Sequence, residues 1–394
     1  MSSQNKKPNG CGCSSIPLSL ILAILGGAYW WFSQKGNLDI SHLLSKIQGI
    51  TIPNVNQITG TFSSPTPSLS SKNNPTPSSQ PASRKTITPK KKLLPPTPWE
   101  KKVIRGIYLS RYQVTNNADE QTIRARVRYY RSQGINTIIH GVWGNGCTMY
   151  KSDVMQQTLG YESCPNQFQE RWLDWLIDEA HQQGMQVHAY FEKGIKIDKN
   201  SPIYDLAISQ GWLVPGVDKT YVGIEQYVLD VEVPEVASFF KNILVEFVQK
   251  YPKIDAVQWD DYLGYYAELP GKVDRTAKLT SFVQPMIAAM KQANPKVSFD
   301  ICHHNPYWAK RYFAADWQKW DVDRVFIQAY NEANFLPELS YAKNYAGIAI
   351  TERQFHHLKE LVDDSAIKSI LVFPLSGKPE ETASRLKSLI ANNN

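Results

Sequence analysis

From residue 103 onward, short apolar runs alternate with longer stretches in which apolar residues recur every three or four positions. The short runs are rich in β-branched residues and indicate buried strands, whereas the longer stretches are typical of amphipathic helices. Gly134 and Gly184 close two of these helical stretches, as is usual at helix ends. We predict eight strands, at 103–109, 135–142, 185–191, 254–259, 296–301, 323–330, 347–351 and 367–375.

Regular alternation of strands and helices predicts a parallel sheet covered by helices. Eight such units in about 300 residues match the count and size of a (β/α)8 TIM barrel of the α/β class, spanning 101–394. An open, doubly wound sheet is the alternative, but no glycine-rich phosphate loop accompanies the first strand-to-helix turn. Residues 227–231 are either a ninth strand outside the barrel or a lead-in to the next helix.

The N-terminal part carries a different pattern. Residues 16–32 form an uncharged apolar run, and roughly 17 to 25 such residues are needed to span a bilayer. Lys6 and Lys7 precede this run and aromatic residues lie at its far end, at 29–31, which predicts a transmembrane anchor with its N-terminus inside and its C-terminus outside. A cleaved signal peptide, with small residues at 26–28, is the alternative. Both interpretations place the rest of the chain outside the cytoplasm, in the periplasm or beyond.

The segments around the anchor are polar or weakly patterned. A short cytoplasmic N-terminus precedes the anchor, an amphipathic segment follows it, and a Pro/Ser/Thr-rich linker without periodicity leads to the barrel. The expected boundaries are 1–15, 16–32, 33–50, 51–100 and 101–394.

Charge is distributed unevenly along the chain. Of the net charge of +7, residues 1–102 contribute twelve Lys/Arg against two acids, or +10, which leaves −3 for 103–394. A slightly acidic folded part has no basic face for a nucleic-acid partner, so none is predicted. Cys147 and Cys164 lie in one connection, where a disulfide would contribute about 3 kcal/mol; spacing alone leaves free thiols equally open.

Side chains with chemical function gather where the predicted strands end, which in a barrel is the catalytic face. Aromatic rings stack on sugars, and amides and imidazoles bond to hydroxyl groups, so the set favours a polysaccharide or other glycan substrate. The candidate substrate-binding residues are His140, Trp143, Asn145, His188, Tyr190, Gln258, Tyr262, Asn305, Gln328 and Tyr330.

Two adjacent acids, Asp260 and Asp261, end the fourth predicted strand. Side chains alternate along a strand, so Asp260 shares a face with Gln258, and Asp261 is expected to turn toward the scaffold in a supporting role. Glycoside hydrolysis needs two carboxylates that flank the bond, so a partner must come from another strand. Glu192, at the end of the third strand, is the best placed. The candidate catalytic residues are therefore Asp260, Glu192 and Asp261.

Several sequence blocks, found in order between about 103 and 376, resemble bacterial family-10-like glycosyl hydrolases. They are GINTIIHGVWGNGCTMYKSDV, HAYFEKG, DVEVPEVASFFKNILVEFVQKY, DAVQWDDYLGYY and HNPYWAKRYFAADWQKW. The resemblance implies a TIM barrel that hydrolyses a glycan outside the cytoplasm, in some members the glycan strands of peptidoglycan. The family's FDD strand end maps onto 259–261 and its WFE onto 190–192, whereas its LNP is replaced by Leu-Asp-Val at 229–231.

Two other classes of function stay open. A sugar-binding barrel without turnover would keep the same surface. A metal-dependent polysaccharide deacetylase is less favoured because the chain contains no HxxxH motif. His356 and His357 are expected on the solvent side of a helix, and no metal or cofactor site is predicted.

Overall fold

The computed structural model describes residues 95–391, apart from 111–115, 215–217, 222–223, 267–268 and 270–273. The segments expected at 1–15, 16–32 and 33–50, and nearly all of 51–100, lie outside the described residues, so the anchor and the linker stay predictions. Across the described part of the chain, no helix combines the length and apolarity needed to cross a membrane.

Eight parallel strands close into a barrel. Each strand pairs with its neighbour along the ring, and β1 pairs with both β2 and β12, so the sheet has no open edge there. All eight overlap the predicted strands, and the closed ring confirms the barrel and excludes the open sheet. In ring order the strands are β1 (Ile104–Leu109), β2 (Thr137–Gly144), β4 (Gln186–Phe191), β8 (Ala256–Asp260), β9 (Ser298–His303), β10 (Arg324–Gln328), β11 (Gly347–Thr351) and β12 (Ser369–Phe373).

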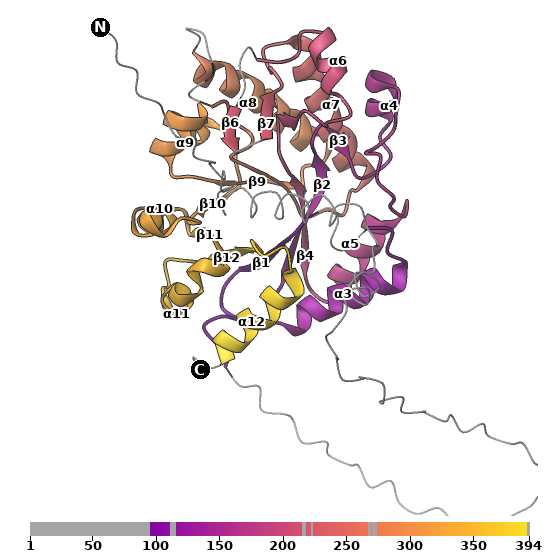
Figure 1. Cartoon of the computed structure of the whole chain (residues 1–394). Helices are drawn as coiled ribbons and strands as arrows, with labels where there is room; N and C mark the ends of the chain where they lie inside the picture. The colour runs from indigo at the N-terminus through magenta and orange to yellow at the C-terminus, as the bar shows by residue number, and fades with distance from the viewer. Residues whose placement is uncertain are drawn as a thin grey trace, which may run out of the picture. The chain divides into compact units, whose positions relative to one another are not determined.

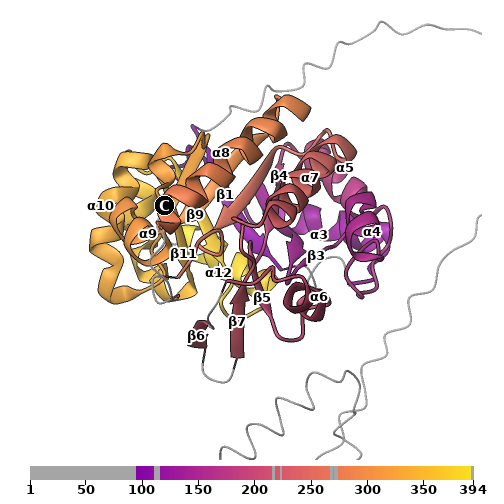
Figure 2. The same cartoon turned by 90° about the horizontal axis from the view of Figure 1, so that it is seen from above.

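Helices surround this barrel (Figure 2). The last helix packs beside the first described one, where the Tyr129 hydroxyl donates to the Glu380 carbonyl at 2.9 Å, so the helical layer also closes on itself (Figure 1). The helices are α3 (Glu120–Ser132), α4 (Asp153–Leu159), α5 (Trp172–Gln182), α6 (Tyr204–Ser209), α7 (Pro234–Lys250), α8 (Arg275–Ala293), α9 (Pro306–Phe313), α10 (Phe335–Tyr345), α11 (Leu358–Asp363) and α12 (Pro379–Ala391), with 3-10 turns η1 (Trp317–Lys319), η2 (Glu332–Asn334) and η3 (Glu352–His357).

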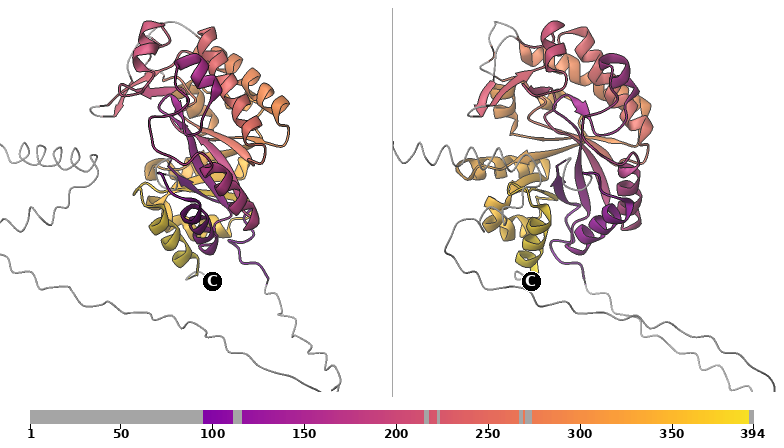
Figure 3. Two further views of the ribbon diagram at one scale, coloured as in Figure 1. Left: turned by 90° about the vertical axis from the view of Figure 1, so that its right-hand side faces the viewer. Right: turned by 45° about the vertical axis from the view of Figure 1, so that its right-hand side comes forward.

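A small second sheet stands apart from the barrel strands (Figures 2 and 3). It is antiparallel and consists of β5 (Lys196–Asp198), β7 (Ile224–Val228) and β6 (Asp218–Tyr221). The ambiguous segment at 227–231 begins inside β7, so a strand outside the barrel is confirmed. A further two-residue strand, β3 (Cys147–Thr148), pairs with β2, and the disulfide between Cys147 and Cys164 is present.

The barrel interior is filled by side chains. Its inward positions carry Ile104, Tyr108, Ile139, Tyr190, Cys302, Phe326, Ala349 and Leu371, all buried. Space is so limited that a Cβ added at Gly106 would lie 2.5 Å from Leu371 Cδ2 and 2.7 Å from Ile139 Cδ1. Chemistry can therefore take place only where the strands end, which is the carboxyl end of the barrel.

Candidate functional site

Two successive inward side chains of β8 define the centre of the candidate site. Gln258 is fully buried and its Oε1 accepts a hydrogen bond from the Tyr108 hydroxyl at 2.6 Å. One layer higher, Asp260 Oδ2 accepts from the Tyr190 hydroxyl, and its Oδ1 accepts from the Tyr262 backbone N–H at 2.9 Å. The predicted common face of Gln258 and Asp260 is thus confirmed.

The environment of Asp260 favours its protonated form. Burial is the main cause, because a charged carboxylate in the barrel interior loses its hydration, and the adjacent Asp261 charge adds to it. The hydrogen bonds from Tyr190 and from the Tyr262 N–H act in the opposite direction, and so does the Lys196 charge. Together these influences raise the pKa of Asp260 to about 8, so this carboxyl group carries a proton at neutral pH.

Asp261 occupies a different position from the one expected. It follows the last residue of β8, where strand alternation no longer applies, and its Oδ1 accepts from Gln328 Nε2 at 3.2 Å. The expected turn toward the scaffold is wrong; the carboxylate lies at the carboxyl end of the barrel. Burial acts to raise the pKa of Asp261, but the positive charges of His304 and Lys196 outweigh it and hold the pKa below the ordinary value. The two neighbouring acids therefore differ in protonation.

Lys196 is a charged residue of the site that the sequence did not single out. Its side chain is buried, and Nζ lies 3.2 Å from the centroid of the Tyr266 ring and 4.8 Å from that of Tyr262. Such rings stabilise a desolvated ammonium through their negative faces. The charge lowers the pKa of both Asp260 and Asp261. A lysine in β5 carries no sequence signal for this position, because the small sheet places it there.

Glu192 lies in a tight turn directly after β4, whose neighbour in the ring is β8, the strand that ends at Asp260. Burial raises the pKa of the Tyr190 phenol well above its ordinary range, and the charges of Asp260 and Glu192 add to that effect, so both acids act on the same hydroxyl. The turn is held by Gly194, whose φ is +46° and at which a Cβ would lie 2.6 Å from the Tyr262 carbonyl oxygen. Trp143 Nε1 donates to the Gly194 carbonyl at 3.0 Å and braces the same turn.

Two predicted sugar contacts lie on the outer side of the barrel wall. Strand alternation in β2 turns His140 toward α5, where its ring centroid is 4.8 Å from that of Trp172 and burial lowers its pKa to about 4. Trp143 is fully buried and packs against Phe239 and Phe240 of α7. Neither side chain can contact a glycan at the carboxyl end, so their predicted role is wrong; both belong to the packing between sheet and helices.

Three further candidates have structural partners. His188 faces inward opposite Ala256 of β8, two inward positions before Asp260; its Nδ1 lies 3.5 Å from Asp300 Oδ2, and its pKa is well below the ordinary value because of burial. Asn145 braces the end of β5, with Oδ1 accepting from the Asp198 N–H at 2.7 Å. Asn305 caps α9 by accepting from the Trp308 N–H at 3.1 Å. Asn145 and Asn305 thus hold the backbone of the fold, and His188 lies in the barrel interior.

The remaining candidates lie together at the carboxyl end. Tyr330 is half-buried, with its hydroxyl 3.8 Å from Cys302 Sγ and its ring 5.9 Å from that of Phe373. Tyr108 was not among the predicted contacts, although its inward position at the end of β1 follows from alternation. The structure thus brings together Tyr108, Tyr190, Glu192, Gln258, Asp260, Asp261, Tyr262, Gln328 and Tyr330.

A cavity of about 600 Å³ lies at the opposite end of the barrel, where β10, β11 and β12 begin. Its lining includes Val103, Arg324, Gly347 and Ser369 and none of the acids described above. The functional assignment therefore depends on the chemistry of the carboxyl end and not on the size of this cavity.

Comparison with known proteins confirms the family resemblance. The family model described as Glycosyl hydrolase-like 10 matches residues 103–273, which include Glu192, Asp260 and Asp261. A curated relative, Glycosyl hydrolase DigH of Escherichia coli (strain K12), is 29% identical over 222 residues, and the match covers 47% of each chain. The chain thus spans about half the length of the curated relatives it matches.

Solved structures with a similar fold include carbohydrate-active enzymes. The GH36 alpha-galactosidase AgaA of Geobacillus stearothermophilus is 14% identical, with a TM-score of 0.43 over 75% of this chain and 43% of that chain. A glycoside hydrolase family 20 beta-N-acetylglucosaminidase is 8% identical, with a TM-score of 0.47 over 74% of this chain and 68% of that chain. At these identities and scores the similarity carries no statement about chemistry.

Proposed function

We propose that this protein is a glycoside hydrolase with Asp260 as its general acid, starting from the match of residues 103–273 to the Glycosyl hydrolase-like 10 family model. The observation that carries the proposal is the difference between two adjacent acids at the carboxyl end of the barrel. The pKa of Asp260 is raised to about 8, whereas that of Asp261 is lowered. Pairs of carboxyl groups with separated pKa values are typical of acid and base assignments.

In this mechanism Asp260 protonates the oxygen of the leaving group, and Glu192 supplies the second carboxylate. Glu192 either attacks the anomeric carbon, at a carboxyl separation of roughly 5 to 5.5 Å, or activates a water molecule, at roughly 6.5 to 9.5 Å. The Tyr190 hydroxyl, bonded to Asp260, orients the acid. Asp261 stays ionised, and its charge helps to keep the proton on Asp260 before the reaction.

The substrate is proposed to be a polysaccharide of the cell envelope or of the surroundings. Aromatic and amide side chains accompany the acids, namely Tyr108, Tyr262, Gln328 and Tyr330, and this composition suits a sugar. We propose that the apolar run at 16–32 tethers the barrel to a membrane, with the linker at 51–100 allowing it to reach glycan away from that surface. The curated relatives support the hydrolase class by their printed name.

The test is turnover by the full-length chain on a panel of glycans that includes peptidoglycan strands freed of peptide. Wild type should release new reducing ends, and Asp260→Asn and Glu192→Gln should each lose at least about 100-fold in kcat, the lower range for removing an acid–base group. Asp321→Asn, at an exposed acid, is the matched control. Binding without turnover by wild type would instead identify a carbohydrate-binding barrel, and release of acetate without chain cleavage would identify a deacetylase.

A further inference from the structure

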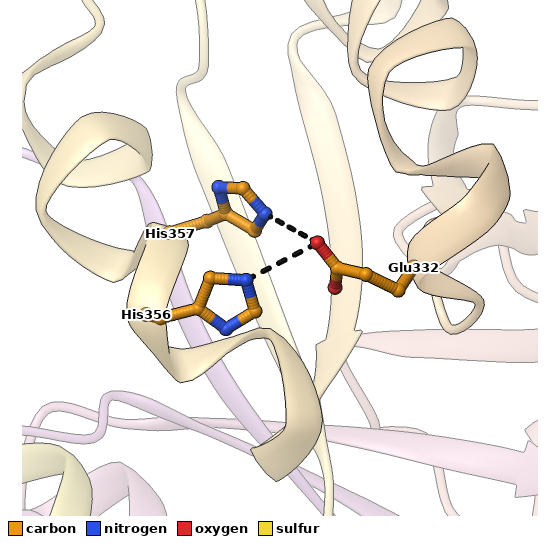
Figure 4. Close-up of side chains that lie close together, drawn as sticks. All are labelled: Glu332, His356 and His357. Atoms are coloured by element: carbon orange, nitrogen blue, oxygen red, sulfur yellow. Dashed lines mark hydrogen bonds and ion pairs between the residues drawn. The ribbon is translucent and has the colours of Figure 1, made fainter.

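Three side chains with metal-binding atoms converge on the rim of the barrel, in the loops that follow β10 and β11. Glu332 begins η2, in the loop that follows β10, and His356 and His357 end η3, which begins directly after β11. Nε2 of His356 lies 3.1 Å from Glu332 Oε1, and Nε2 of His357 lies 2.9 Å from the same oxygen (Figure 4). The two histidines were expected on the solvent side of a helix. His356 is exposed, His357 is half-buried, and the 3-10 turn directs both rings to one carboxylate.

The arrangement is held in place by neighbouring side chains. The His357 ring is stacked on Phe335, with centroids 3.8 Å apart and planes within 8°. Its Nδ1 lies 3.6 Å from Glu360 Oε2, and a carboxylate on that side leaves Nε2 as the nitrogen available to a ligand. Gln354, which is fully buried, places Nε2 3.5 Å from Glu332 Oε2. The ring and the carboxylate are thus oriented before any ligand arrives.

The spacing fits a small transition-metal cation. The ligand atoms of Glu332, His356 and His357 all lie within 4.8 Å of one another, and no other such group occurs among the described residues. Zinc bonds to imidazole nitrogen at about 2.0–2.1 Å in tetrahedral geometry, which corresponds to roughly 3.3 Å between ligand atoms. A cation between the three atoms would therefore need only small side-chain movements. Two histidines and one carboxylate also leave the fourth position open to water.

We propose that Glu332, His356 and His357 bind a divalent transition-metal ion of the zinc class. The ion connects the loop after β10 to the loop after β11. Gln354 Nε2, which approaches Glu332, also donates to the Tyr330 carbonyl at 3.3 Å, so the metal site is linked to a residue of the candidate glycan site. The ion acts as a positioning element, because its link to the glycan site runs through the Gln354 side chain: it fixes two rim loops and the position of Tyr330, and it takes no part in the proton transfer.

The experiment uses the full-length chain without a histidine tag, freed of metal and titrated separately with ZnCl2 and CoCl2. Calorimetry should give one zinc per chain, and cobalt should develop the visible absorption of a tetrahedral site. His356→Ala, His357→Ala and Glu332→Gln should each weaken zinc binding by at least about 100-fold, because even outer partners of metal ligands contribute about 10- to 100-fold. His181→Ala is the matched control, since that histidine also bonds a carboxylate, Asp255, but has no third ligand.

Equal zinc affinity in wild type and the three variants would overturn the proposal, as would cobalt spectra of six-coordinate, weakly bound ion. His356 is exposed, so its replacement should leave the fold intact, which the unfolding midpoint of the metal-free variant checks. Metal binding is measured without a glycan. A negative result for metal binding therefore does not affect the hydrolase assignment, and a negative result for glycan turnover does not affect the test of the metal site.

Discussion

Replacing Asp260 by Asn should change how the stability of the protein depends on pH, and this can be measured without knowing the substrate. The folded-state pKa of Asp260 is raised from 3.8 to about 8. Because this pKa is raised on folding, the contribution of the Asp260 carboxyl group to stability is fully present below the unfolded pKa of 3.8 and is lost as the pH rises through about 8. Asparagine resembles the protonated carboxyl in shape and cannot ionise, so the variant should not suffer this loss.

The magnitude follows from the size of the shift. A rise of about four pKa units corresponds to about 6 kcal/mol over the full range, at about 1.36 kcal/mol per unit. About 4 kcal/mol of this lies between pH 5 and pH 9, because part of the loss occurs below pH 5. This difference is a large share of the about 5–15 kcal/mol that stabilises an ordinary folded protein.

The assay is urea unfolding of the full-length wild type and of Asp260→Asn at pH 5, 7 and 9. The free energy of unfolding of the wild type should fall with pH relative to that of the variant, by about 4 kcal/mol between the extremes. Asp119→Asn is the matched control, because Asp119 caps α3 at an exposed position and asparagine caps equally well. Parallel curves for wild type and Asp260→Asn would refute the inference that this acid is protonated at neutral pH.

Three other changes have defined outcomes. Asp261→Asn removes the charge that helps to raise the pKa of Asp260, so the basic limb of the pH–rate profile should move to lower pH by about one unit. An unmoved limb would contradict the electrostatic coupling between Asp260 and Asp261. Reducing the Cys147–Cys164 disulfide, with a sequence separation of 17, should lower the free energy of unfolding by about 3 kcal/mol and therefore lower the urea midpoint. In the variant with Ser at both positions, the reductant should leave the urea midpoint unchanged. Trp143→Ala should lower the free energy of unfolding by about 3–5 kcal/mol, because the Trp143 side chain is fully buried. Weaker glycan binding with unchanged stability would show that Trp143 contacts the sugar after all.

The barrel was predictable because its signal is repeated eight times. Each parallel strand is buried on both faces and therefore forms an apolar run, and each helix has one apolar stripe. The same alternation correctly placed Gln258 and Asp260 on the inner face. It failed for Asp261, because β8 ends one residue earlier and the turn reverses the direction of the side chain.

Strand alternation alone also does not predict which polar and aromatic side chains are buried. His140 lies within β2 and Trp143 near its end, and the sequence does not distinguish a ring at the carboxyl end from one packed against α5 or α7. Lys196 and the Glu332–His356–His357 group were missed for a related reason. Their partners come from other elements, so only the tertiary arrangement brings them together.

The most direct test of the central claim is a crystal structure of Asp260→Asn with a bound oligosaccharide that the wild type cleaves. The side chain at position 260 should lie within hydrogen-bond reach of the scissile glycosidic oxygen. Glu192 should lie on the other side of the bond, at a carboxyl-to-amide separation of roughly 5 to 9.5 Å, which also decides between retention and inversion. A separation above about 10 Å, or a glycan bound away from the carboxyl end of the barrel, would contradict the assignment of this pair.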